Sequence, residues 1–125
     1  MHYIIFVLFC FLYAVLNVTG AAIIKNEIAS NPIESIKDYF PLLLNLKVIG
    51  AFVLIFISAL VIFKALSMMK FSIVLPIANG INFGLTILIG ILIFNDKINL
   101  YHIFGLSLIL FGIILISVAE KINTL

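Results

Sequence analysis

The sequence predicts an all-α membrane protein with four transmembrane helices in an up-down-up-down arrangement. Of its 125 residues, 66% are apolar and 10% are charged, whereas a soluble domain is about half apolar and a quarter charged. A spanning helix needs about 20 mostly apolar residues, and four such runs with their loops use the whole chain. We therefore expect one domain over residues 1–125 and no enzymatic activity.

The first predicted span covers residues 3–24. It has no positive segment before it and is too long for a signal peptide, so we interpret it as part of the mature protein. Tyr13 and Asn17 share one helical face. An amide in hydrocarbon is costly unless it is hydrogen-bonded. We therefore expect Asn17 to face the bundle or a wet cavity, where it either lines a substrate pathway or only bonds to a neighbouring helix.

The loop after this span is the longest non-spanning stretch, and we expect Glu27 to lie in it. Asn31 and Pro32 are typical of a helix start, and apolar residues then recur at helical spacing. This pattern predicts a short amphipathic helix on the membrane surface over residues 32–40, which Pro41 would end. An irregular polar loop is the alternative.

The remaining spans are predicted over residues 44–68, 71–94 and 100–119. Lys64 lies about one turn inside the end of the second span. It either reaches the interface with its ammonium group or holds an anionic head group such as a lipid phosphate. Lysines are almost evenly divided between the two sides, so the positive-inside rule leaves the topology open.

The third span is the most polar and the richest in glycine. Candidate pathway residues lie near one face at i, i+3 and i+7, namely Asn79, Asn82 and Thr86. A proline and a Gly-x-x-x-Gly pair predict a helix bend at Pro76, Gly80 and Gly84. This pattern is typical of a helix that lines a transport pathway. The alternative is that the glycines and amides serve helix packing alone.

In the fourth span, Gly105 and Gly112 are seven residues apart on one face. Small residues let helices approach closely in lipid. Four short helices enclose little space, so we assign these glycines to a dimer interface, with a second copy or with a similar four-helix partner.

Several kinds of chemistry are not expected. The formal net charge of +2 is too small to indicate nucleic-acid binding. The sequence has no metal-ligand cluster and no cofactor motif, so we expect neither a metal nor a cofactor. A proton-coupled exporter of cations uses a carboxylate within the membrane, and the five acidic residues are expected in loops or at helix ends.

Residues 78–119 resemble the small multidrug resistance family of the drug/metabolite transporter superfamily. The resemblance rests on three features, which are the polar-glycine segment of the third span, the NDKINL hairpin and the Gly105–Gly112 spacing. NVTGAAIIK in the first span is similar to the segment that holds the family's membrane glutamate, but Asn17 stands at that position. No tryptophan is present to line a site for drug cations.

The chain also resembles a branch of this superfamily whose paired subunits flip aminoarabinose-linked undecaprenyl phosphate. Those subunits lack the glutamate, and one has a long first loop and a lysine like Lys64 in FKAL. This resemblance implies a flippase subunit in a bacterial inner membrane, with membrane lipid and a lipid-linked substrate as partners. A small multidrug or metabolite exporter is the first alternative, and a non-transporting subunit of a glycosyltransferase or envelope complex is the second.

Overall fold

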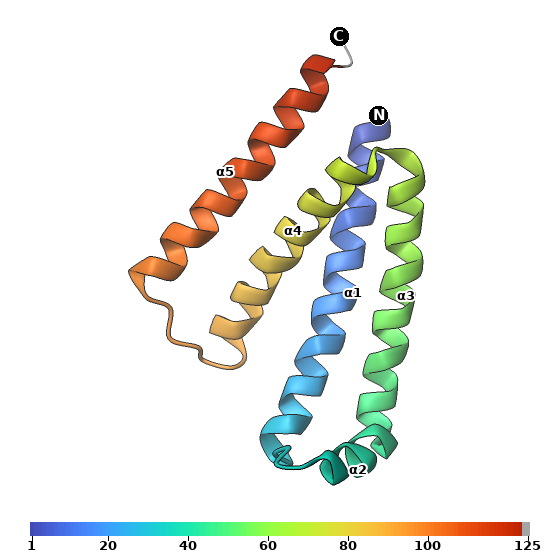
Figure 1. Cartoon of the computed structure of the whole chain (residues 1–125), viewed down its shortest axis with the longest axis vertical. Helices are drawn as coiled ribbons and strands as arrows, with labels where there is room; N and C mark the ends of the chain where they lie inside the picture. Colours follow the sequence, from blue (N-terminus) through green and yellow to red (C-terminus); the bar gives the residue numbers. More distant parts are fainter. Residues whose placement is uncertain (124–125) are drawn as a thin grey trace.

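The computed structural model of the protein describes residues 1–123, which form an all-α fold. Four helices are long and apolar enough to cross a membrane: α1 (His2–Ser30), α3 (Leu46–Met68), α4 (Phe71–Leu92) and α5 (Leu100–Asn123). Consecutive spans run in opposite directions, as the short loops require (Figure 1). The chain is therefore a multi-pass membrane protein with the predicted four spans.

The four spans are not equally packed. Helix α1 packs chiefly against α3 and then against α4, so these three helices form the body of the molecule. Helix α5 lies outermost and contacts α4 (Figure 1). No residue of α5 is buried, which makes it the least enclosed of the spans.

The core lies at the end of the molecule where α3 turns into α4. Phe6 and Cys10 of α1 are fully buried there. They pack with apolar side chains of the other two helices: Ile62, Ala65, Ile73, Val74, Ile77 and Ala78. Tight burial at this end anchors α1 between α3 and α4, and α4 diverges from α1 toward the other end (Figure 1).

The helix ends differ from the predicted ones most clearly in the first span. Helix α1 has 29 residues and continues to Ser30 instead of stopping at residue 24. At about 1.5 Å per residue it is about 43 Å long, longer than the hydrocarbon layer of about 30 Å. Glu27, expected in the loop, instead lies in the last turn of α1, and its partners explain why the helix extends, as described below.

The predicted surface helix at residues 32–40 is displaced. Residues 31–35 are not helical, and two short helices follow, η1 (Ile36–Asp38) and α2 (Tyr39–Leu44). The start is set by Asp38, whose Oδ2 accepts the backbone N–H groups of Glu34 and Ser35 at 2.9 and 2.8 Å. Pro41 does not end a helix but lies in the first turn of α2, where the missing N–H has no intrahelical partner to lose.

The other boundaries lie within two residues of the predicted ones, except that α5 continues to Asn123, four residues beyond the predicted end of the fourth span. Helix α3 starts two residues later than expected because the Asn45 side chain caps it, accepting the Lys47 backbone N–H at 2.9 Å. Helix α4 is continuous through Pro76 and ends at Leu92. The chain then turns through Asn95, which has a φ of 53°, and Asp96 N–H bonds to Gly90 O at 2.9 Å.

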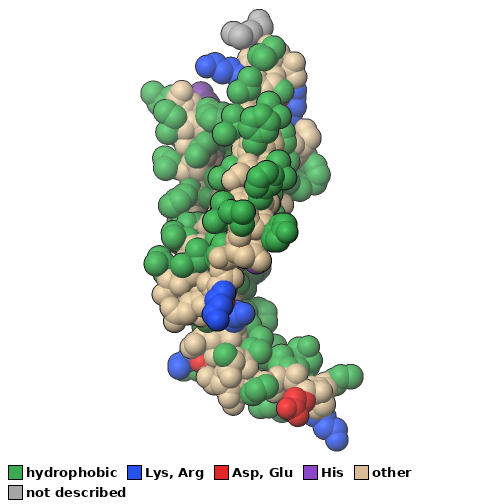
Figure 2. Space-filling model, turned by 90° about the vertical axis from the view of Figure 1, so that its left-hand side faces the viewer, with side chains coloured by type: hydrophobic (Ala, Val, Ile, Leu, Met, Phe, Trp, Pro, Cys, Tyr) green, Lys and Arg blue, Asp and Glu red, His purple; other side chains and the backbone are tan. Residues whose placement is uncertain are grey.

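The surface has the layering of a membrane protein. Figure 2 shows apolar side chains along the middle of one face and lysines toward its two ends. Every long side chain on the lipid-facing side of α5 from Ile103 to Leu115 is aliphatic or aromatic. This apolar band is consistent with helices that stand across a bilayer.

Candidate functional site

A chain of hydrogen bonds joins three helices near the middle of the bundle. Asn82 of α4 donates from Nδ2 to Asn17 Oδ1 of α1 at 3.1 Å. Asn17 donates from its own Nδ2 to Ser58 Oγ of α3 at 3.5 Å. Thr86 Oγ1 donates to the backbone oxygen of Asn82 at 2.8 Å and lies 3.3 Å from its side-chain oxygen. We call these four residues the amide network.

Close approach of α1 and α3 brings the network together. A Cβ on Gly20 would lie 2.9 Å from the backbone oxygen of Ala51 and 2.7 Å from a side-chain carbon of Ile55. Only glycine therefore fits at this crossing, and one turn away Asn17 reaches Ser58. Small residues serve the same purpose in membrane helices generally.

Ser58 is a member that the sequence interpretation missed. It is 1% exposed, and its hydroxyl donates to Ile55 O at 2.6 Å while receiving the Asn17 amide. A signal was present in the sequence, because Ser58 is the one polar residue in the central part of α3. Its position opposite Asn17 depends on helix packing, which the spacing within one span does not contain.

The predicted pathway residues are only partly assembled into one site. Asn17, Asn82 and Thr86 meet in the amide network, while Tyr13 is half-buried and packs against the core cluster. Asn79 is exposed on α4 and makes no hydrogen bond within residues 1–123. Lys64 is also exposed, and it forms no ion pair within the described chain. The structure thus leaves Asn79 and Lys64 outside the network.

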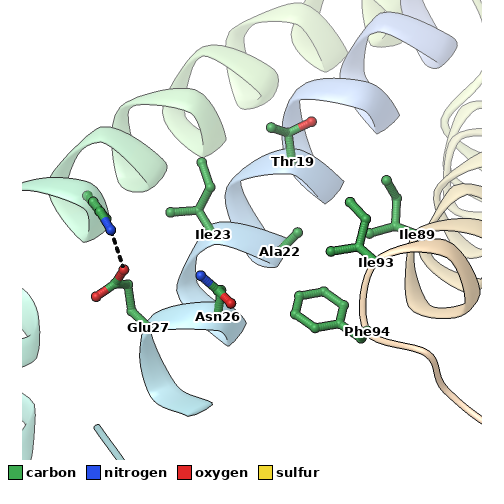
Figure 3. Close-up of a pocket in the computed structure, with 9 residues that line it drawn as sticks. Thr19, Ala22, Ile23, Asn26, Glu27, Ile89, Ile93 and Phe94 are labelled. Carbon is green, nitrogen blue, oxygen red and sulfur yellow. Dashed lines mark ion pairs between the residues drawn. The ribbon is translucent and has the colours of Figure 1, made fainter. Parts of the chain in front are cut away.

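Below the amide network, α1 and α4 diverge and leave two openings. The larger, of about 590 Å³, lies between α1, α3 and α4 (Figure 3). Its walls are mostly apolar, with Thr19, Asn26, Glu27 and Lys47 as the polar members. The apolar members are Ala22, Ile23, Ile89, Ile93 and Phe94.

The smaller opening, of about 180 Å³, lies on the other side of the α1–α4 seam and shares Ala22, Ile89 and Phe94 with the larger one. Thr86 of the amide network lines it, together with Lys25 and Asp96. The Lys25 ammonium lies 5.7 Å from the centre of the Phe94 ring, a cation–π distance. This opening leads from the network to the charged end of the bundle.

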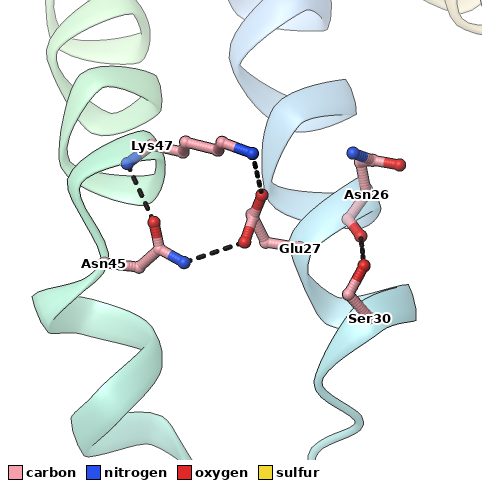
Figure 4. Close-up of polar contacts among 5 residues, drawn as sticks. All are labelled: Asn26, Glu27, Ser30, Asn45 and Lys47. Carbon is pink, nitrogen blue, oxygen red and sulfur yellow. Dashed lines mark hydrogen bonds and ion pairs between the residues drawn. The ribbon is translucent and has the colours of Figure 1, made fainter.

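A buried carboxylate lies at the end of the larger opening that is farther from the amide network. Glu27 is 7% exposed. It accepts a hydrogen bond from Asn45 Nδ2 at 2.8 Å and pairs with Lys47 Nζ at 3.4 Å (Figure 4). Burying a carboxylate is costly unless it is paired and hydrogen-bonded. These two partners from the start of α3 supply both contacts, which corrects the expectation that Glu27 lies in a polar loop.

The predicted bend and dimer glycines have different surroundings. Gly80 is buried against α5, because a Cβ there would overlap the end of the Ile113 side chain. Gly84, Gly105 and Gly112 have nothing within 4 Å of an added Cβ. Gly80 therefore serves packing between α4 and α5 inside one chain, while the other three glycines lie on open surface.

The charged groups do not form a metal site. Among residues 1–123, no group of three or more His, Cys, Asp or Glu side chains is placed to hold a metal ion. The polar groups of the amide network are neutral hydrogen-bond donors and acceptors. The arrangement can bind and exchange hydrogen bonds with a polar group inside the membrane, and it holds no nucleophile–base pair.

Comparison with known proteins adds no relative. No family model, no curated protein and no solved structure matches this chain.

Proposed function

We propose that the chain is a small transporter subunit that moves a lipid-linked or otherwise amphipathic molecule across a bacterial inner membrane. The observation that carries the proposal is the amide network, whose Thr86 lines the smaller of the two mostly apolar openings. A polar head group that crosses hydrocarbon must keep hydrogen-bond partners. Asn17, Asn82 and Thr86 offer such partners halfway across.

The walls of the openings favour a cargo with an apolar tail. Aliphatic and aromatic side chains from α1, from α4 and from the two residues after α4 make up most of the lining. Lys25 and Lys47 lie at the outer end of these walls, where each can contact a phosphate of an arriving head group. A molecule with a polar or anionic head and an apolar tail complements both the apolar walls and the lysines at their outer end.

Lys64 has a separate role in the proposal. It is exposed one turn before the end of α3, at the opposite end of the bundle from Lys47. Its ammonium is therefore open to lipid head groups on that side, and we assign it to contact with the cargo phosphate there. If Lys64 has this role, Lys64→Gln is expected to abolish transport.

The chain is proposed to form a dimer, either with a second copy of itself or with a similar four-helix protein. Helix α5 has no buried residue, and its two glycines are open. The resemblance to the small multidrug resistance family and to its flippase branch points in the same direction.

The test is transport in reconstituted vesicles. A polyprenyl phosphate with a fluorophore that dithionite bleaches is placed in both leaflets, and dithionite is added outside. The chain is expected to expose the inner-leaflet probe, and Asn17→Leu or Asn82→Leu to slow this step by about tenfold, which corresponds to about 1.4 kcal/mol. Ser107→Ala is the matched control, because that hydroxyl bonds only to Ile103 of its own helix.

Other results reject the proposal. Export of a quaternary ammonium dye without movement of the polyprenyl phosphate would assign the chain to the multidrug exporters. Movement of neither probe would favour a non-transporting subunit of an envelope complex. Equal rates for the two Asn variants and the unmodified chain would remove the amide network from the pathway.

A further inference from the structure

Helix α4 has a line of polar side chains on one exposed face. Ser72, Asn79 and Thr86 follow one another at intervals of seven residues, so they lie one above another along the helix. All three are exposed. At about 1.5 Å per residue, the line from Ser72 to Thr86 is about 21 Å long, against about 33 Å for the whole helix. We call these three residues the polar line.

Two members of the polar line have hydrogen-bonding groups without a partner. Neither the Asn79 amide nor the Ser72 hydroxyl makes a hydrogen bond within residues 1–123. Pro76, one turn after Ser72, has no N–H to donate to the Ser72 carbonyl oxygen. An unpaired amide or carbonyl group is costly in hydrocarbon. These groups therefore need a polar partner from outside the described part of the chain.

The polar line is continuous with the amide network and with the smaller opening. Thr86 belongs to all three, because it lines that opening and its hydroxyl donates to Asn82 O at 2.8 Å. Asn82 lies between Asn79 and Thr86 along the helix. Polar groups thus follow one another along α4 from the smaller opening to the first turn of the helix, where Ser72 lies.

The surroundings of Asn79 argue against a second helix as its partner. Membrane helices pair closely where small residues face each other. The residues one turn from Asn79 on either side are Leu75 and Phe83, and Phe83 is 52% exposed. Gly90 shares this face, but the Asp96 carboxylate fills the space beside it, since an added Cβ would lie 2.6 Å from Asp96 Oδ2. A mobile head group needs no such close approach between backbones.

We propose that the cargo head group moves along the polar line on the outside of α4, while its apolar tail stays in the surrounding lipid. This inference rests on the proposed transport function and extends its path from the smaller opening to Ser72. Asn79 is the intermediate step. Every other residue between Ser72 and Asn82 has an apolar side chain or none. Without Asn79, the head group would cross about 15 Å with no side-chain partner.

The dithionite assay with the labelled polyprenyl phosphate tests this route. Asn79→Leu is expected to slow transport by about threefold to twentyfold, the change in rate that corresponds to one hydrogen bond within a membrane. Asn79→Gln keeps an amide and should restore a rate close to that of the unmodified chain. Phe83→Leu is the matched control, because it changes the same face without changing its polarity, and its rate should not change.

Two further measurements separate this role from a structural one. Asn79→Leu should not lower the unfolding temperature in detergent, because it removes no hydrogen bond within the described chain. With Cys10→Ser as background, Asn79→Cys should give no intermolecular disulfide on mild oxidation, because the polar line faces the cargo and lipid instead of a second copy.

The possible failures are distinguishable. If the unmodified chain does not move the probe, the proposed function fails and this route fails with it. If Asn79→Leu transports at the full rate while Asn17→Leu is slow, the proposed function stands and the route along the polar line is wrong. A lower unfolding temperature for Asn79→Leu, or equal slowing by Phe83→Leu, would assign the effect to structure. A disulfide at position 79 would mean that a second copy covers this face, which also overturns the route.

Discussion

At the scale of single residues, the two amides of α4 provide a matched comparison. Asn82 bonds to Asn17 and to Thr86, whereas Asn79 lies three residues away and is exposed. Hydrogen bonds between membrane helices contribute on average about 0.6 kcal/mol and at most about 1.7 kcal/mol. The network is therefore a modest source of stability, and its position in the bilayer is its more informative property.

This difference predicts the effect of removing each amide. Asn82→Ala should lower the free energy of unfolding by about 1–2 kcal/mol, because it leaves the Asn17 carbonyl without its donor. Asn79→Ala should cause no loss, since it removes no bond within the described chain. Unfolding of purified protein in detergent, followed by circular dichroism, measures both. An equal loss for the two variants would contradict the network.

The sequence predicts the surroundings of a residue best where the free-energy cost of placing its side chain in hydrocarbon depends only on the residue type. Asn17 is expected to face other protein because an unpaired amide is costly in hydrocarbon, and it does so. The partner Ser58 and the exposed positions of Lys64 and Asn79 depend on helix rotation and packing. Those properties arise between spans, and the polar spacing within one span does not determine them.

At the scale of helices, the contact between α1 and α3 depends on Gly20. An added Cβ would meet the Ala51 backbone oxygen at 2.9 Å, and a backbone atom cannot rotate away as a side chain does. Gly50 of α3 has nothing within 4 Å of an added Cβ. An alanine substitution at each of the two glycines therefore separates the effect of packing from the effect of helix propensity on stability.

Gly20→Ala is expected to destabilise the fold by about 1–3 kcal/mol through overpacking. Gly50→Ala should be neutral or slightly stabilising, because alanine is the better helix former. Thermal unfolding of both variants in the same detergent checks this prediction. A loss at Gly50 as large as at Gly20 would show that the cost does not come from the α1–α3 contact.

The first loop contains a pH-sensitive helix start. Backbone N–H groups of Glu34 and Ser35 hold the pKa of Asp38 below its ordinary value of 3.8. A lowered pKa means that the carboxylate stabilises the folded loop above the ordinary pKa. This stabilisation is lost as the pH falls through the lowered value.

We therefore expect faster amide exchange in residues 35–44 at about pH 3 than at about pH 6, after correction for the intrinsic exchange rate. Asp38→Asn should make exchange fast at both pH values and remove the difference. Glu34→Gln is the control, because its side chain makes no hydrogen bond in the described chain. A pH difference that persists in Asp38→Asn would assign the effect to another group.

A comparison of the predicted and observed helix ends shows which features of each helix can be predicted from the sequence. The spans are predicted from apolar length, and four of them are present. The end of α1 is missed because Lys25, Asn26 and Glu27 are polar, yet Glu27 is retained in the helix by Asn45 and Lys47. The surface helix is displaced because Asp38, and not Asn31, fixes its start.

At the scale of the whole molecule, the four spans are unequally buried. Residues of α1 and α4 are enclosed by neighbours, whereas no residue of α5 is buried. Helix α5 is held by the face that contains Ile113, Ser117 and Glu120. Its glycine line lies on a neighbouring face and is open, so it is available to a second copy of the chain.

This arrangement predicts where two copies meet. With Cys10→Ser as background, Gly112→Cys should form an intermolecular disulfide in membranes on mild oxidation, because paired glycine faces bring Cα atoms within the bridging range of about 4.4–6.8 Å. Ser107→Cys lies on a different face of α5 and should react much less. Dimer bands on non-reducing gels measure the difference. A stronger dimer band from position 107, or none from either position, would exclude α5 pairing through its glycines and would leave lipid as the neighbour of that face.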